Sequence, residues 1–242
     1  MKDQKVNKPQ KQKEPLKLDI LYEDEQFVAY HKPVGIPSQK TKDHKRVTFE
    51  GEVHKCCGLE KVTAYTLLHR LDKDTSGVLL FAKSKEISEL GFNLFKHRHF
   101  KKEYIALCEG NLKQKEGHWV HFLDKAGSRQ GKQYFKCVRS GGLKAEVSYR
   151  VIDSQKGLSL LHLYPKTGRT HQLRVQCAEM GLPIVGDSLY NLHSKLNASN
   201  HFLHAYRLSC DYENPLDIEA PLPQVFSQLA KQKGLSLKGI NK

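Results

Sequence analysis

A continuous apolar run, Val78-Leu79-Leu80-Phe81-Ala82, directly follows the charged stretch from His69 to Gly77. Five apolar residues without alternation are typical of a strand buried on both faces, so the run predicts a central strand of a covered sheet. Leu67 and Leu68 precede the charged stretch. The stretch is therefore a short loop held at both ends by buried structure, and loops of this kind often carry functional groups.

The segments on either side of this strand show both strand and helix patterns. Residues 18–22 and 27–30 are short β-rich runs around a polar turn, which predicts a hairpin. Ser84 can cap a helix through about Lys96, because the apolar residues that follow it recur on one helical face. Residues 40–61 are polar and charged and predict a long loop or a poorly ordered excursion.

The second half of the chain has a mainly β pattern. Strand signals at 104–108 and 119–163 are separated by turn-forming glycines, namely Gly127, Gly131, Gly141, Gly142 and Gly157. A helix from near Thr170 to Gly181 would carry Leu173, Cys177 and Met180 on one face. Residues 202–210 and 216–220 predict strands, and 224–231 a last short helix. The expected fold is α+β: a large, mainly antiparallel mixed β-sheet flanked by helices and loops.

The charge of the chain favours a polyanionic partner. Forty Lys and Arg residues against 26 Asp and Glu give a formal net charge of +14. Each phosphate that such a protein neutralises releases counterions and adds affinity, so RNA or DNA is the expected partner. A basic protein that is only kept soluble by its charge is the alternative. Residues 1–17 hold six lysines and almost nothing apolar, which predicts a disordered basic tail.

Membrane and metal sites are not expected. No apolar run approaches the roughly 18 residues that cross a bilayer, and no apolar segment follows the basic N-terminus as in a secretory signal. We therefore expect a cytoplasmic protein with no membrane partner. The six cysteines include no CxxC pair. His54, Cys56 and Cys57 form a local cluster without a second ligand pair, so free thiols are expected in place of a zinc site.

The loop that starts at His69 combines charged and turn-forming residues. Arg70, Asp72 and Asp74 lie close together, and Thr75-Ser76-Gly77 has strong turn chemistry. An aimed, ionised aspartate can act as a nucleophile, and a neighbouring cation keeps its pKa from rising on burial. Closure of an Asx turn by Asp72 or Asp74 is the alternative that the spacing leaves open.

A second charged segment, Thr167-Gly168-Arg169-Thr170, opens the helix that contains His171, Gln172 and Arg174. The free N–H groups of a helix start, together with Arg169, can hold a phosphate. Arg174, one turn further on, could instead reach inward to a carboxylate. Ordinary capping with solvated arginines is the alternative.

Blocks of sequence in a fixed order carry a resemblance to a known family. His69-Arg70-Leu71-Asp72-x-x-Thr75-Ser76-Gly77 resembles the signature of the RluA family of pseudouridine synthases. The further matching blocks are Lys32-Pro33-x-Gly35, Lys102-Glu103-Tyr104-Ile105-Ala106, Thr167-Gly168-Arg169-Thr170-His171-Gln172-Leu173-Arg174, Gly181-x-Pro183-Ile184-x-Gly186-Asp187 and Leu203-His204-Ala205. The resemblance runs from about residue 18 to 222. It implies a short form without an S4 domain, in which the tail 1–17 precedes one catalytic domain at 18–242.

The resemblance implies an enzyme that isomerises uridine to pseudouridine in rRNA or tRNA without cofactor or metal. Asp72 matches the essential aspartate, and Arg174 the arginine that pairs with it. Tyr104 matches the tyrosine that stacks on the target uracil and is a candidate for proton transfer. Arg70 matches a side chain that fills the space left by the flipped nucleotide. The remaining expected RNA contacts are His69, Lys32, Arg169, His171, Lys101 and Lys102. No protein partner is implied, and we expect a monomer.

Two other functions use the same residues. A nucleoside or glycoside hydrolase would share Asp72 but would need a second carboxylate as general acid. An RNA-binding or ribosome-assembly factor without catalysis would need only the basic surface and not the catalytic residues.

Overall fold

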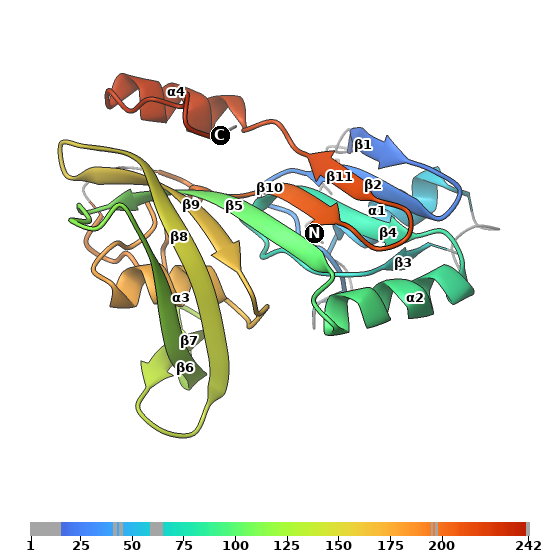
Figure 1. Ribbon diagram of the computed structural model, residues 1–242, viewed down its shortest axis with the longest axis horizontal. Coiled ribbons are helices and arrows are strands. Elements are labelled where there is room, and N and C mark those ends of the chain that lie inside the picture. The colour runs from blue at the N-terminus through green and yellow to red at the C-terminus, as the bar shows by residue number, and fades with distance from the viewer. Residues whose placement is uncertain are drawn as a thin grey trace, which may run out of the picture.

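The computed structural model describes residues 16–40, 43, 46–58, 65–194, 196 and 198–240, so residues 1–15 of the predicted tail lie outside the described part. Within these residues, eleven strands form one sheet in the order β1-β2-β4-β10-β5-β9-β8-β6-β7, with β11 paired to β10 and β3 to β4 (Figure 1). The β4–β10 pair is parallel and the other pairs are antiparallel. The expected α+β fold on a mainly antiparallel mixed sheet is confirmed.

The elements in chain order are β1 (Ile20–Glu23), β2 (Phe27–Lys32), α1 (Phe49–Cys56), β3 (Thr66–Leu67), β4 (Ser76–Ala82), α2 (Lys85–Lys96), β5 (Phe100–Glu109), β6 (Glu116–Arg129), β7 (Lys132–Val138), β8 (Leu143–Gln155), β9 (Leu158–Pro165), α3 (Gln172–Glu179), β10 (Leu203–Cys210), β11 (Leu216–Glu219) and α4 (Gln224–Gln232). The predicted hairpin, the helix after Ser84 and the last helix are confirmed. None of the helices described here is long and apolar enough to cross a membrane.

The apolar strand β4 is covered on both faces, as its sequence predicts. Val78 and Leu80 pack into a cluster with the apolar face of α2, whereas Leu79 and Phe81 pack into a second cluster with α1. Successive side chains of a strand point to opposite faces, so a strand between two helices must be apolar throughout. All seven residues of β4 are buried.

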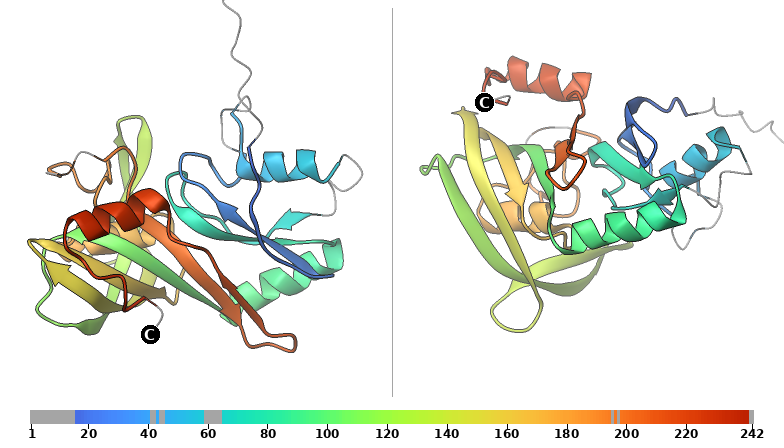
Figure 2. Two further views of the ribbon diagram at one scale, coloured as in Figure 1. Left: turned by 90° about the horizontal axis from the view of Figure 1, so that it is seen from above. Right: turned by 45° about the vertical axis from the view of Figure 1, so that its right-hand side comes forward.

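The other half of the sheet is covered by α3 and α4. On β5, Ala106 and Cys108 belong to the cluster that contains α3, whereas Ile105 and Leu107 belong to the cluster that contains α4. Figure 2 shows α4 lying across this half while α1 and α2 flank the other half. Each half of the sheet therefore packs against a hydrophobic cluster on both of its faces.

Three sequence predictions of local structure were wrong. Within the predicted loop 40–61, the described residues Phe49–Cys56 form the helix α1: Thr48 accepts a hydrogen bond from Gly51 N at 3.2 Å, and Phe49 and Val53 are buried. Two apolar residues one turn apart suffice for this helix, but they are inconspicuous in a polar sequence. Gly127 lies at a bulge inside β6 and not at a turn. Met180 follows the end of α3 and is exposed, so it does not belong to the buried face.

The centre of the sheet brings distant segments together. β4 lies beside β10, where the Ser76 hydroxyl and His204 Nδ1 are 2.8 Å apart. On the other side of β10, β5 places Tyr104 opposite Ala205. The charged loop before β4 therefore lies close to the start of β5, although about thirty residues separate them in sequence.

Candidate active site

A cleft of about 1070 Å³ lies where the loop before β4, strand β5 and the start of α3 meet. Asp72, Tyr104, His171 and Arg174 all line it. It is also lined by basic side chains, namely Lys40, Arg46, Arg70, Lys73, Lys96, Arg98, Lys102, Lys132, Lys166 and Arg169. A carboxylate within a cleft of many cations is suited to a polyanionic substrate.

The loop that carries Asp72 is fixed by its backbone. Thr75 N donates to the Asp72 carbonyl at 3.1 Å, which closes the turn. Leu71 N donates to the Ser38 hydroxyl at 3.0 Å, and that hydroxyl donates back to the Leu71 carbonyl at 2.8 Å. The Thr75 hydroxyl pairs with His201 Nε2 at 2.8 Å. The turn thus forms without the Asp72 side chain, whose carboxylate accepts from Arg174.

Arg174 joins two carboxylates. Its Nη1 donates to Asp72 Oδ2 at 2.9 Å, while its Nε and Nη2 donate to the two oxygens of Asp187 at 2.7 and 2.9 Å. Asp187 also accepts from the backbone N–H groups of Leu189 and Tyr190. The bidentate pair fixes the plane of the guanidinium, so that its third donor is aimed at Asp72.

The charges at this site keep Asp72 ionised. Burial alone would raise the pKa of Asp72, but His171, Arg174 and His201 hold it below its ordinary value in acid, where the imidazoles are protonated, and at neutral pH the positive charge beside it is that of Arg174. Burial likewise opposes ionisation of Asp187, and its hydrogen bonds with Arg174 more than compensate, so its pKa is lowered as well. Both aspartates are therefore carboxylates at neutral pH.

Tyr104 remains a protonated phenol. Burial and the nearby charge of Asp72 both raise its pKa. Its ring lies in the same cleft as the carboxylate, with Leu203 and Leu173 also on the cleft wall. An aromatic ring here offers a flat apolar surface for a base, and its hydroxyl offers a proton donor.

Most of the predicted RNA contacts line the cleft, whereas Lys32 and Lys101 do not. The predicted contacts that line the cleft are His69, Arg70, Lys102, Arg169 and His171. Burial lowers the pKa of Lys102 to about 8, and its ammonium donates to the Thr167 carbonyl at 3.1 Å. Lys101 is exposed outside the cleft lining and forms an ion pair with Asp211.

His69 supports the loop. Its Nε2 accepts from Leu80 N at 3.2 Å, and its ring lies against Phe95. Burial, followed by the charge of Lys102, lowers the pKa of His69 to about 3, so the ring is neutral. It connects the start of the loop to β4.

Lys32 lies beneath the same loop and is fully buried. Its ammonium donates to the carbonyls of Pro33, Ile36 and Lys73 at 2.7, 2.9 and 3.1 Å. Burial lowers its pKa to about 7, against the favourable charges of Asp74 and Asp72. The structure therefore places Lys32 as a tie between β2 and the loop that carries Asp72.

Replacing Lys32 with Met should lower the free energy of unfolding by about 2–5 kcal/mol, because three carbonyls lose their donor. Urea unfolding followed by circular dichroism measures this change. Lys85→Met, at an exposed position on α2, is the matched control and should change stability by less than about 0.5 kcal/mol. Equal stability of the two variants would show that the three hydrogen bonds contribute nothing.

Sequence reasoning assigned no role to Asp187, Tyr190 or His201. Asp187 stood in a matched block, beside Gly186, and that block was the available signal. Tyr190 and His201 carry no local pattern, and their roles come from contacts with Arg174, His171 and the loop.

Comparison with known proteins agrees with this geometry. The sequence profile of the RNA pseudouridylate synthase family matches residues 26–179. An uncharacterized RNA pseudouridine synthase of Zymomonas mobilis is 35% identical over 214 residues, covering 87% of this chain and 96% of that protein. The ribosomal large subunit pseudouridine synthase D of Borreliella burgdorferi is 36% identical over 201 residues, which span 79% of this chain and 60% of the relative.

Solved structures show the same fold. Human RNA pseudouridylate synthase domain containing 4 superposes with a TM-score of 0.76 at 24% identity, covering 90% of this chain and 94% of the human one. The family profile covers the loop of Asp72, strand β5 and helix α3, which together build the cleft. The chain therefore belongs to the RNA pseudouridylate synthase family and is an isomerase that converts uridine in RNA to pseudouridine.

Proposed function

We propose that Asp72 is the carboxylate that attacks the target nucleotide, and that the RNA is ribosomal or transfer RNA. The observation that carries the first part is the Asp72–Arg174–Asp187 chain, in which a buried guanidinium aims one donor at an ionised carboxylate in the cleft. For the second part, the name of the Borreliella burgdorferi relative specifies ribosomal RNA. We place this activity in the cytoplasm, where ribosomal and transfer RNA occur.

To reach Asp72 in the cleft, the target nucleotide must leave the stack of its neighbouring bases. Ribose C1′ and uracil C5 are hidden in a stacked strand, so the base must be flipped out at a cost of a few kcal/mol. Tyr104 stacks on the flipped uracil, a contact worth about 1–3 kcal/mol per base. Its protonated hydroxyl is available for proton transfer. Arg70, which is exposed at the cleft, enters the space that the nucleotide leaves.

The cations of the cleft hold the RNA backbone. Arg169 and Lys102 contact it inside the cleft, and Lys101 contributes from the exposed surface of β5. Each neutralised phosphate adds affinity and makes binding dependent on salt. No cofactor or metal takes part in this proposal.

A hydrolase would need a second carboxylate that can donate a proton. Both oxygens of Asp187 are bound by Arg174, and its pKa is lowered, so Asp187 is a poor acid. This observation favours isomerisation with Asp72 alone.

Incubation of the protein with unmodified rRNA and tRNA transcripts tests the proposal. Pseudouridine is detected as a reverse-transcription stop after carbodiimide treatment, and the position of the stop identifies the RNA and the nucleotide. Release of free uracil would identify a hydrolase instead. Binding without either product would identify a non-catalytic RNA-binding factor.

A further inference from the structure

His171 lies between Asp72 and Tyr190 in an unusual backbone conformation. Its Nε2 is 3.8 Å from Asp72 Oδ2, and its Nδ1 is 2.9 Å from the Tyr190 hydroxyl. Its φ of 55° lies in the left-handed region, which a residue other than glycine seldom adopts. His171 is also the N-cap position of α3, yet its side chain makes no capping hydrogen bond. Its side chain is therefore held for the cleft and not for the helix start.

The hydrogen bonds of Tyr190 favour one tautomer of the His171 ring. Phe135 N donates to the Tyr190 hydroxyl oxygen at 3.0 Å, so the hydroxyl hydrogen is free to donate to His171 Nδ1. A neutral imidazole that accepts at Nδ1 carries its hydrogen on Nε2. Burial lowers the pKa of His171, so the ring is neutral at neutral pH. The Nε2–H group consequently faces Asp72.

We infer that His171 is a positioning residue for the isomerisation: it presents Nε2–H to the Asp72 carboxylate in a tautomer that Tyr190 selects. The inference rests on the proposed role of Asp72. Arg174 Nη1 and His171 Nε2 both face Oδ2 of Asp72. Arg174 binds this oxygen and His171 faces it, so the attack is assigned to the other oxygen, Oδ1, which neither of these two donors faces. The 3.8 Å separation is longer than a hydrogen bond, so the carboxylate can still shift toward the nucleotide.

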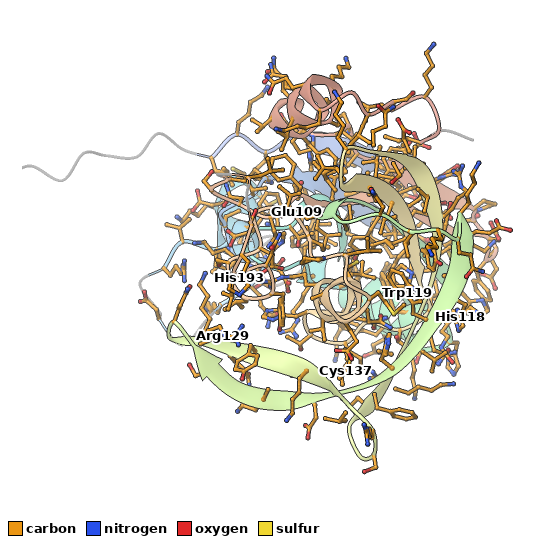
Figure 3. The ribbon with its side chains drawn as sticks, turned by 90° about the vertical axis from the view of Figure 1, so that its left-hand side faces the viewer. Glu109, His118, Trp119, Arg129, Cys137 and His193 are labelled. Atoms are coloured by element: carbon orange, nitrogen blue, oxygen red, sulfur yellow. The ribbon has the colours of Figure 1, made fainter. Side chains whose placement is uncertain are left out.

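The same contacts tie Asp72 to the long β6–β7 hairpin. Phe135 belongs to β7, and Arg129, at the end of β6, donates from Nη1 to the Leu189 carbonyl at 2.8 Å. Figure 3 shows Arg129 toward the far end of this curved hairpin, with Cys137 further along it. Lys132 and Phe135 of the hairpin line the cleft. A hairpin that helps to line the cleft is thus linked through Tyr190 and His171 to the carboxylate that we propose to react.

Replacing His171 with Gly tests the inference, because glycine tolerates the positive φ and leaves a hole the size of an imidazole. We expect kcat to fall by about 10- to 100-fold, as for a misplaced catalytic group, while KM stays within about two-fold. Added imidazole should restore kcat in a saturable way and should leave the wild-type rate unchanged. A purely structural role would give no such rescue. A kcat of His171→Gly within about two-fold of wild type overturns the inference.

Tyr190→Phe is the second variant and tests the same role of His171 if His171→Gly does not fold or is not rescued by imidazole. It keeps the ring over the Arg174 guanidinium but no longer selects the tautomer. We expect a lower kcat at unchanged KM, whereas the exposed Tyr212→Phe should behave as wild type. A wild-type kcat for Tyr190→Phe overturns the inference. Asp72→Asn, measured in parallel, separates the two proposals: full activity there refutes the role of Asp72, whatever His171 does.

Discussion

Replacing Asp72 with Asn is expected to lower kcat by about 10⁴-fold or more, which is the scale of losing a nucleophile. The amide has nearly the same shape as the carboxylate but carries no charge and cannot attack. Arg174 remains held by Asp187 on two of its donors, so the cleft should keep its form. RNA affinity should therefore stay within a few-fold. Single-turnover rates with a target transcript, together with filter-binding affinities, measure both quantities.

Asp74→Asn is the matched control for this prediction. Asp74 lies two residues further along the same loop and also lines the cleft, but the hydrogen bonds of Arg174 described above go to Asp72 and Asp187 and not to Asp74. Its variant should keep the rate within about three-fold of wild type. If Asp72→Asn retained a tenth of the wild-type rate, or if Asp74→Asn lost more activity than Asp72→Asn, the nucleophile would have to be reassigned.

Local sequence signals predicted those parts of the molecule that depend on local chemistry. The unbroken apolar run 78–82 predicted a strand buried on both faces, and β4 is covered by α1 and α2. Ser84 predicted the start of α2, and its hydroxyl accepts from Ile87 N. For the site, the spacing around Asp72 left a turn or a nucleophile open. The matching blocks named Asp72, Tyr104 and Arg174, and all three line one cleft.

The parts that the sequence did not predict depend on contacts between distant residues. A lysine such as Lys32 is normally exposed, and only the fold shows that three carbonyls surround its ammonium. Helix α1 is hidden in a polar segment because its stability comes from two side chains packed on the sheet. An aspartate such as Asp187 is also normally exposed. Only the fold shows that it is buried and that Arg174 pairs with both of its oxygens.

Replacing Asp187 with Asn is expected to lower the free energy of unfolding by about 3–5 kcal/mol and to reduce kcat as well. The Asp187 side chain is fully buried and that of Arg174 is 7% exposed, so the variant leaves a buried cation with one carboxylate in place of two. The guanidinium then loses the pair that fixes its plane, and Asp72 loses an aimed donor. Urea unfolding and single-turnover rates measure the two effects. Asp217→Asn, in an exposed pair with Arg207, should cost less than about 1 kcal/mol.

The stability effect of Asp187 should depend on pH. Because the pKa of Asp187 is lowered in the folded protein from an ordinary value of 3.8, its contribution is present above about pH 4 and is lost as the pH falls through the folded value. Wild type and Asp187→Asn should therefore differ most near neutral pH and converge in acid. Urea unfolding from pH 7 down to pH 3 measures this. A difference that stays constant with pH would mean that the ion pair is not its source.

A double variant separates the structural and catalytic effects of the pair. Arg174→Met combined with Asp187→Leu removes both buried charges, and replacing a buried ion pair with apolar residues is often neutral or stabilising. Unfolding free energy should therefore recover to within about 2 kcal/mol of wild type. The rate should not recover, because Asp72 would lose its guanidinium and face only His171. Recovery of both stability and activity would show that Arg174 serves the fold alone. Recovery of stability without activity would identify the guanidinium as the group that holds Asp72 ionised and aimed.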